Sequence, residues 1–143
     1  MTPTFEKYAV KFSDPLLLIG RLLLALIFLH ESITLTGGFT AASAYMAKVG
    51  VPRFMLLPTI ALQFGSGLML AFGFHARLGA LSLGLFCLVT AFFFHTDLAS
   101  KDELLHFEKD LAIAGGLFVL MVKGAGAWSL DGLMRAKASV SNT

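Results

Sequence analysis

Four long apolar runs constrain this chain more than any other feature of its sequence. They cover residues 15–36, 54–74, 76–95 and 104–122, and each is apolar nearly all round a helix. Crossing the hydrocarbon core of a bilayer takes about 20 such residues. Because a backbone in lipid must satisfy its own hydrogen bonds, each run is expected to be a helix. The sequence therefore predicts an all-α integral membrane protein, a four-helix bundle that forms a single domain over residues 1–143.

Composition agrees with a membrane protein and excludes some functions. Of the 143 residues, 57% are hydrophobic and 14% are charged, whereas a soluble domain is about a quarter charged. The formal net charge is only +2 and no basic block is present, so the expected partner is the lipid bilayer and not a nucleic acid. The single cysteine, Cys87, lies in an apolar run and is expected to be buried and inert.

The connections between the runs differ in length. Residues 74–77 are so few that the second and third runs are expected to form a tight antiparallel pair. Residues 39–53 are more numerous, and their apolar side chains recur at helical spacing, which predicts a short interfacial helix between the first two membrane helices. Beyond the fourth run, Trp128 is a candidate interfacial anchor, and Ser129 is placed to cap a short C-terminal helix.

The distribution of Lys and Arg predicts the orientation. With four membrane helices, both termini and the short middle connection lie on one side of the membrane. That side carries the larger share of cations, so the positive-inside rule predicts cytoplasmic termini. Arg21, the cation inside the first run, is expected to snorkel to the same side. The cations on the predicted cytoplasmic side are Lys7, Lys11, Arg77, Lys123, Arg135 and Lys137, and those on the outer side are Lys48, Arg53, Lys101 and Lys109.

All four runs bring polar side chains to the outer half of the predicted bundle. On the fourth run, His106 is three residues from Lys109 and four from Asp110, so the three share a helix face. Charge inside a membrane segment is costly and usually faces a wet cavity or the bundle interior. These residues therefore predict an outward-facing polar pocket, for which Glu31 and Asp110 would supply counter-ions. The candidate pocket residues are His30, Glu31, Gln63, His95, His106, Lys109 and Asp110.

The same residues allow two other interpretations. The side chains of His106, Glu108 and Lys109 would need no special role if they lay in the head-group layer. Metal binding is not expected, since neither H-x-x-x-H nor H-E-x-x-H spacing occurs and the ligands would have to converge from three helices. No catalytic residue is assigned and no cofactor motif is evident, so enzyme activity is left open.

Several short motifs occur in an order that resembles the DoxX family. They are LLLALIFLHESI at 22–33, YM at 45–46, GVP at 50–52, QFGSGL at 63–68, HFEKDLAIAGG at 106–116 and GAGAWSLD at 124–131. DoxX proteins are small four-helix proteins of the bacterial inner membrane, and the resemblance covers nearly the whole chain. It implies a multi-pass protein of the bacterial plasma (inner) membrane. Some family members look like small subunits of thiosulfate–quinone oxidoreductases, and others are associated with redox-stress complexes.

The chain departs from the family pattern at several positions. Relatives often have Glu where this chain has Gln63, Asn where it has Asp110, and Lys where it has Leu35. They often read Gly-Pro-Gly-Arg where this chain reads GAGA at 124–127. The loss of an acid at Gln63 and of a base at Leu35, with acids gained at Glu31 and Asp110, would re-site a charge pair.

Three functions are compatible with these features. The first is a helper or small subunit of a quinone-linked redox system, in which the pocket hydrogen-bonds a quinone head group while Phe92, Phe93 and Phe94 meet its ring or tail. His106 and Glu31 would pass protons, and a redox partner subunit would supply electrons. The second is a structural or assembly subunit without chemistry. The third is a small-solute or proton carrier, which would require a homo-oligomer.

Overall fold

The structure is a computed structural model that describes residues 12–95 and 97–141. The predicted all-α class is confirmed for this part of the chain, which contains helices and no strand. Two of the cations used to predict the orientation, Lys7 and Lys11, lie outside the described residues. The elements are α2 (Ser13–Gly37), α3 (Phe39–Lys48), the 3₁₀ turn η1 (Arg53–Met55), α4 (Leu56–Phe72), α5 (Ala76–Phe94), α6 (Lys101–Lys123) and α7 (Leu130–Ser141).

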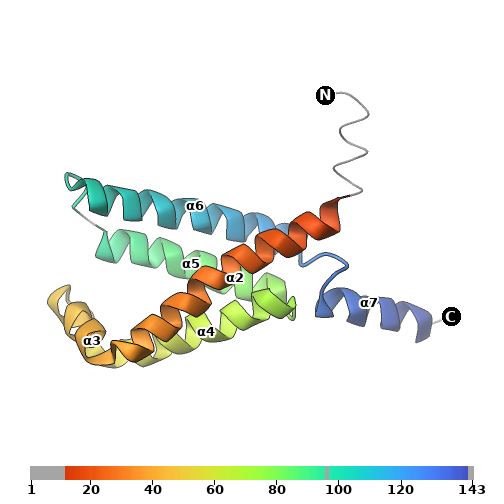
Figure 1. The fold of residues 1–143 in the computed structure, drawn as a ribbon, viewed down its shortest axis with the longest axis horizontal. Coiled ribbons are helices and arrows are strands. Elements are labelled where there is room, and N and C mark those ends of the chain that lie inside the picture. The colour runs from red at the N-terminus through yellow and green to blue at the C-terminus, as the bar shows by residue number, and fades with distance from the viewer. Residues whose placement is uncertain (1–11, 96, 142–143) are drawn as a thin grey trace.

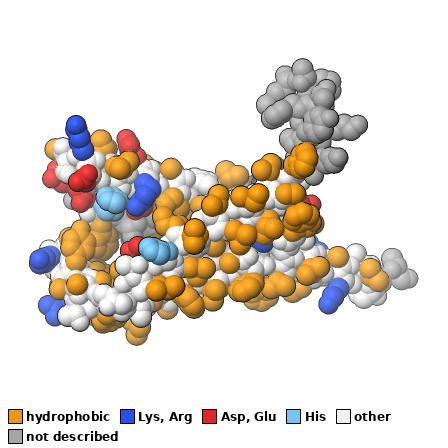
Figure 2. Space-filling view, in the orientation of Figure 1, with side chains coloured by type: hydrophobic (Ala, Val, Ile, Leu, Met, Phe, Trp, Pro, Cys, Tyr) orange, Lys and Arg blue, Asp and Glu red, His pale blue; other side chains and the backbone are white. Residues whose placement is uncertain are grey.

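Three helical segments are long and apolar enough to cross a membrane. They are α2, the η1–α4 segment Arg53–Phe72, and α5. Figure 2 shows hydrophobic side chains along the flanks of these helices, where lipid would meet them. The 23 residues of α6 give it enough length, but Glu108, Lys109 and Asp110 interrupt its apolar sequence. Length and hydropathy therefore support a membrane protein, and they support three of the four predicted spans.

The long helices pack as two pairs. α2 lies against α4, and α5 lies against α6, while α4 also contacts α5 and so joins the pairs (Figure 1). α2 meets α6 at only a few positions, which leaves room between the two pairs. The phenyl ring of Phe118 on α6 fits against Gly84 on α5, where a β-carbon would come within 2.7 Å of the ring. The core between the pairs includes Ala25, Phe28, Leu70, Leu83, Leu117 and Leu120.

The short connection between α4 and α5 is built around Gly73. Its φ of 65° lies in the left-handed region, which glycine adopts without steric cost and which ends α4. Downstream, the Asp131 carboxylate accepts hydrogen bonds from the backbone N–H groups of His75 and Ala76 at 2.9 and 3.0 Å. These bonds satisfy N–H groups at the start of α5 and fix the C-terminal segment to it.

A buried arginine joins α2 to the segment that follows α6. Arg21 is 2% exposed, so the prediction that it snorkels to the surface was wrong. Its Nη1 donates to the carbonyl oxygen of Ala125 at 2.8 Å, and its Nη2 donates to that of Trp128 at 3.0 Å. The carbonyls hold the guanidinium because the chain turns back over it before α7. The prediction that Ser129 caps α7 is confirmed, since its Oγ accepts a hydrogen bond from the Gly132 N–H at 3.0 Å.

Candidate functional site

Two adjoining cavities lie between the helix pairs. Their volumes are about 480 and 320 Å³. They are at the end of the molecule where α3 lies, away from α7 (Figure 1). In Figure 2 this end carries most of the visible Lys, Asp, Glu and His side chains, and its surface is hollowed. The two cavities share five lining residues, so a single ligand can extend from one cavity into the other. The shared residues are Glu31, Gln63, Phe86, Thr90 and His95.

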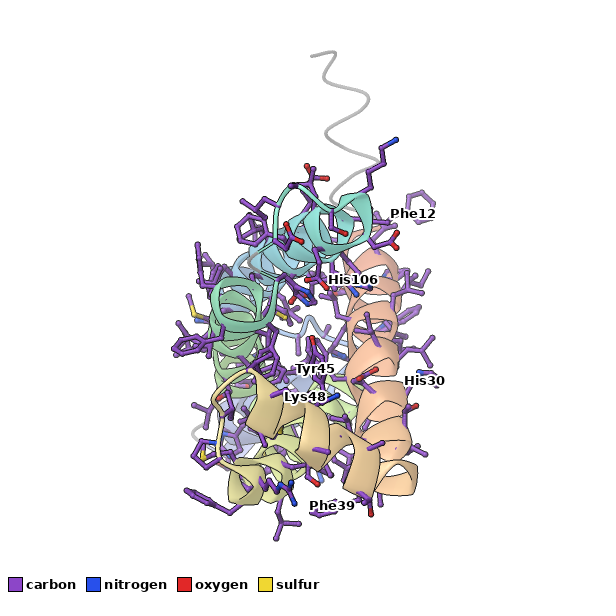
Figure 3. The ribbon with its side chains drawn as sticks, turned by 90° about the vertical axis from the view of Figure 1, so that its left-hand side faces the viewer. Phe12, His30, Phe39, Tyr45, Lys48 and His106 are labelled. Atoms are coloured by element: carbon purple, nitrogen blue, oxygen red, sulfur yellow. The ribbon has the colours of Figure 1, made fainter. Side chains whose placement is uncertain are left out.

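The larger cavity is mainly apolar and is partly covered by α3. Tyr45 and Met46 of α3 line it together with Phe94 of α5. The rings of Tyr45 and Phe94 stack with their centroids 6.2 Å apart, and Tyr45 points toward the opening between the helices (Figure 3). Leu35 and Leu56 add aliphatic surface. This cavity therefore suits a hydrophobic ring or chain.

The smaller cavity is polar because α6 turns its charged face toward it. His106, Lys109 and Asp110 all line it, across from Glu31 on α2. The Lys109 Nζ lies 3.1 Å from the His106 Nδ1. The His106 ring also stacks on the ring of His95, the residue directly after α5, with centroids 5.2 Å apart and an interplanar angle of 18°. Residues from α2, α5 and α6 thus surround one polar space.

A chain of close contacts runs from this cavity toward the start of α6. The Thr90 hydroxyl donates a hydrogen bond to the Asp110 Oδ2 at 2.9 Å. The same carboxylate oxygen is 3.9 Å from the His95 Nε2, and the other ring nitrogen of His95 is 2.9 Å from the Glu103 Oε2. The exposed fraction of the side chain rises from 13% at Asp110 through 20% at His95 to 33% at Glu103. The imidazole therefore bridges an inner carboxylate and a more accessible one.

Gln63 is the buried polar residue that lacks a partner at the junction of the cavities. It is 3% exposed and lines both of them. Its Oε1 is buried without a hydrogen bond, and its side chain makes none with the described residues. Leaving such a group unpaired costs about 1–3 kcal/mol. A bound molecule with a matching polar group would remove this cost.

The structure separates His30 from the other predicted pocket residues. The six others, namely Glu31, Gln63, His95, His106, Lys109 and Asp110, line the smaller cavity. His30 is exposed and lies on the outer side of α2, away from the opening (Figure 3). One residue along a helix turns the side chain by about 100°, so Glu31 faces inward while its neighbour faces out.

The three consecutive phenylalanines also point in different directions. Phe94 lines the larger cavity. Phe93 is 64% exposed on the outer surface, and Phe92 packs edge-to-face on Phe107 with centroids 5.5 Å apart. Of the three, Phe94 thus lines a cavity, whereas Phe92 and Phe93 line neither of the two and face outward, where only the tail of a ligand would meet them.

Sequence reasoning missed Thr90, Glu103, Tyr45 and Phe86 as residues of the site. Glu103 precedes His106 by three residues and Asp110 by seven, so the three share a helix face. The fourth helix was predicted to begin at residue 104, which excluded Glu103, whereas α6 begins at Lys101. Thr90 is four residues from Phe86 and Phe94, a spacing that would have placed it on their face of α5.

The side chains of the site suit hydrogen bonding and proton exchange. In residues 12–95 and 97–141, no three His, Cys, Asp or Glu side chains are grouped so that they would hold a metal ion. The polar cavity offers carboxylates, imidazoles, an ammonium and an amide beside a space lined by aromatic and aliphatic groups. An amphipathic molecule with a polar ring fits this division.

Known proteins were compared with the whole chain. A model of the DoxX family matches residues 16–96, which include most of α2 and all of α3, α4 and α5. Inner membrane protein YqjF of Escherichia coli (strain K12) is 39% identical over 127 residues, covering 89% of this chain and 98% of YqjF. Inner membrane protein YphA of the same organism is 33% identical over 123 residues, covering 81% of this chain and 88% of YphA. No solved structure matches. The chain therefore belongs to the DoxX family.

Proposed function

We propose that this chain spans the bacterial inner membrane four times, with α6 as the fourth span and cytoplasmic termini. At about 1.5 Å per residue, α6 is about 35 Å long, enough for a hydrocarbon core of about 30 Å. Its Lys109 and Asp110 line a cavity, so lipid need not surround them. α3, which exposes Phe39 and Tyr45, would lie in the membrane interface. The names of YqjF and YphA support the inner-membrane location.

We propose further that the joined cavities bind the head group of a membrane quinone. The observation that carries this proposal is the unpartnered amide of Gln63 at the junction of the polar and apolar cavities. An amide offers an acceptor to a quinol hydroxyl and a donor to a quinone carbonyl. Phe86 and Phe94 would contact the ring, and the apolar lining would receive the start of the tail.

The contacts of His95 with Glu103 and Asp110 support a route for protons into the site. Reduction of a quinone to a quinol takes up two electrons and two protons. Asp110 and His95 would deliver protons to the head group, and Glu103 would replace them from the membrane surface. A redox partner subunit would supply the electrons. His95 thus takes the role that the sequence had suggested for His106.

Direct binding measurements test the quinone proposal. Equilibrium dialysis of the purified chain in detergent, with short-chain ubiquinone and short-chain menaquinone, gives a Kd for each. We expect Gln63→Leu to weaken binding by about tenfold or more, because one hydrogen bond is lost in a dry site. His30→Ala is the matched control and should bind as the wild type does. If the wild type binds neither quinone, or if Gln63→Leu binds equally well, the proposal is wrong.

A structural role without chemistry is the second candidate. The Thr90–Asp110 and His95–Glu103 contacts favour it, because each ties α5 to α6. In that case Gln63→Leu would raise the stability of the protein by removing an unpaired amide, and it would change no quinone measurement. A carrier has less support, since Leu70, Leu83 and Leu117, all 0% exposed, fill the core between the helices.

A further inference from the structure

A third cavity lies at the opposite end of the molecule, next to α7. Its volume is about 500 Å³. Its lining comes from the start of α5, from Gly124 and Ala125 after α6, and from one face of α7. Figure 1 shows α7 extending from this end, with α3 and the other cavities at the far end. The proposed quinone site has no residue in common with it.

Positive charge dominates this cavity. Arg77 and Arg135 line it, together with His75. Asp131 is the one carboxylate among the lining residues, and both of its oxygens already accept backbone hydrogen bonds, from the N–H groups of His75 and Ala76. In the described part of the chain, neither guanidinium is within 4 Å of a carboxylate oxygen. An anion bound here would therefore meet two cations that form no ion pair with the described residues.

Arg77 lies beside the turn that follows α6. Its side chain lies against Gly124, where an added β-carbon would be 3.2 Å from the Arg77 Nε. Gly124 has φ of 82°, a conformation in which a larger residue would be strained. The guanidinium therefore lies beside the backbone at Gly124, next to the cavity, and its hydrogen-bond donors have no partner among the described residues. A planar guanidinium binds a phosphate through two parallel hydrogen bonds.

The surroundings of the cavity are apolar on the side that faces lipid. Leu78 and Met134 line it and are 58% and 46% exposed. Above Leu78 on the same face of α5, Leu81 and Leu85 are also exposed. Trp128, 59% exposed, lies at this end, as aromatic residues do at the membrane interface. The two arginines would therefore lie at head-group depth, with a hydrophobic surface running from them into the membrane.

We infer that this cavity binds the phosphate of an anionic phospholipid. Arg77 and Arg135 would hold the phosphodiester, and the acyl chains would lie along Leu78, Leu81 and Leu85. Phosphatidylglycerol is the simplest lipid of this class. The same guanidiniums would attract free phosphate, but only a lipid also uses the exposed leucines. Basic pockets beside membrane helices are a known mode of anionic lipid recognition.

Native mass spectrometry of the full chain in detergent tests this inference. The protein is titrated separately with phosphatidylglycerol, phosphatidylcholine and inorganic phosphate. We expect phosphatidylglycerol to bind more tightly than the other two, and the Arg77→Gln/Arg135→Gln variant to lose about tenfold or more of that affinity. The matched control is Arg53→Gln/Lys101→Gln, which removes two cations at the opposite end and should bind as the wild type does.

Each alternative outcome has a definite meaning. Equal binding of phosphatidylglycerol by the double variant and the wild type would overturn the inference. Equal affinity for phosphatidylcholine would show that charge does not select the lipid, and tight binding of inorganic phosphate would show a free-anion site; either result would overturn it. Should the double variant fail to fold, Arg135→Gln alone removes an exposed side chain of α7 and must still weaken phosphatidylglycerol binding.

Discussion

At the scale of single residues, the inner carboxylate of the polar cavity depends on a hydroxyl from the neighbouring helix. Thr90 on α5 donates to Asp110 on α6 at 2.9 Å. We expect Thr90→Val to lower the free energy of unfolding by about 1–2 kcal/mol, because a partly buried carboxylate then loses its donor. Denaturation in mixed micelles of a mild detergent and dodecyl sulfate measures this change.

The control for Thr90 is a threonine whose hydroxyl bonds within its own helix. Thr34 is exposed, and its Oγ1 donates to the carbonyl of His30. Thr34→Val should change the free energy of unfolding by less than about 0.5 kcal/mol. Equal effects of the two substitutions would mean that the contact between α5 and α6 adds no stability of its own.

Arg21 gives a second prediction at the residue scale. Arg21→Met removes the donors to the carbonyls of Ala125 and Trp128, and two buried acceptors then lose their partners. We expect a loss of about 1–3 kcal/mol in the free energy of unfolding. Backbone hydrogen exchange should become faster in residues 124–141 and stay unchanged in α3. If hydrogen exchange in residues 124–141 is the same in Arg21→Met as in the wild type, the guanidinium does not hold this segment.

The sequence showed which types of side chain form the candidate site better than it showed which of them point into the cavity. Charged and amide side chains within apolar runs pointed to a pocket, and six of the seven named residues line one cavity. His30 and Glu31 are adjacent, and both are plausible by type, so only the packing of α2 against its neighbours decides which faces inward. Arg21 was misjudged for the same reason, because its partners are carbonyls more than 100 residues away along the chain.

At the scale of helices, α6 is the element whose membrane role requires a direct test. In a Cys87→Ser background, single cysteines at Ser100 and Ser139 lie before and after α6. If α6 crosses the membrane, a membrane-impermeant maleimide should label Ser100→Cys in intact cells. Ser139→Cys should be labelled only after the membrane is opened. Labelling of both positions from the same side would contradict a fourth span.

The helices themselves follow from the sequence more directly than their ends do. Long apolar runs require helices in lipid whatever their neighbours are, and the cap at Ser129 needs only local chemistry. The start of α6 was predicted three residues late because the apolar run that marked the helix begins only after Lys101, Asp102 and Glu103. Acidic residues in the first turn of a helix are stabilised by its dipole, and this favours the earlier start.

At the scale of the whole molecule, the arrangement in two helix pairs explains why the cavities exist. α4 joins α2 to α5, but α2 and α6 meet at few positions, so the space between them stays open at the end that α3 covers. Sequence patterns could not show this, because they give the apolar faces of helices and not which pairs make close contact. We expect a ligand of the proposed site to enter from the membrane between α2 and α6.

Cross-linking α2 to α6 tests that route. Ile27 on α2 and Ile113 on α6 both line the polar cavity. In a Cys87→Ser background, Ile27→Cys/Ile113→Cys joined by a reducible bifunctional thiol reagent should lose fast quinone exchange, with a rate about tenfold or more below the wild-type rate. Reduction should restore it, because the restraint is then released. The same double variant treated with a monofunctional reagent of equal size is the control, since it fills similar space without joining the helices. If the cross-linked protein exchanges quinone at the wild-type rate, entry between α2 and α6 is excluded and the opening beside α3 becomes the route.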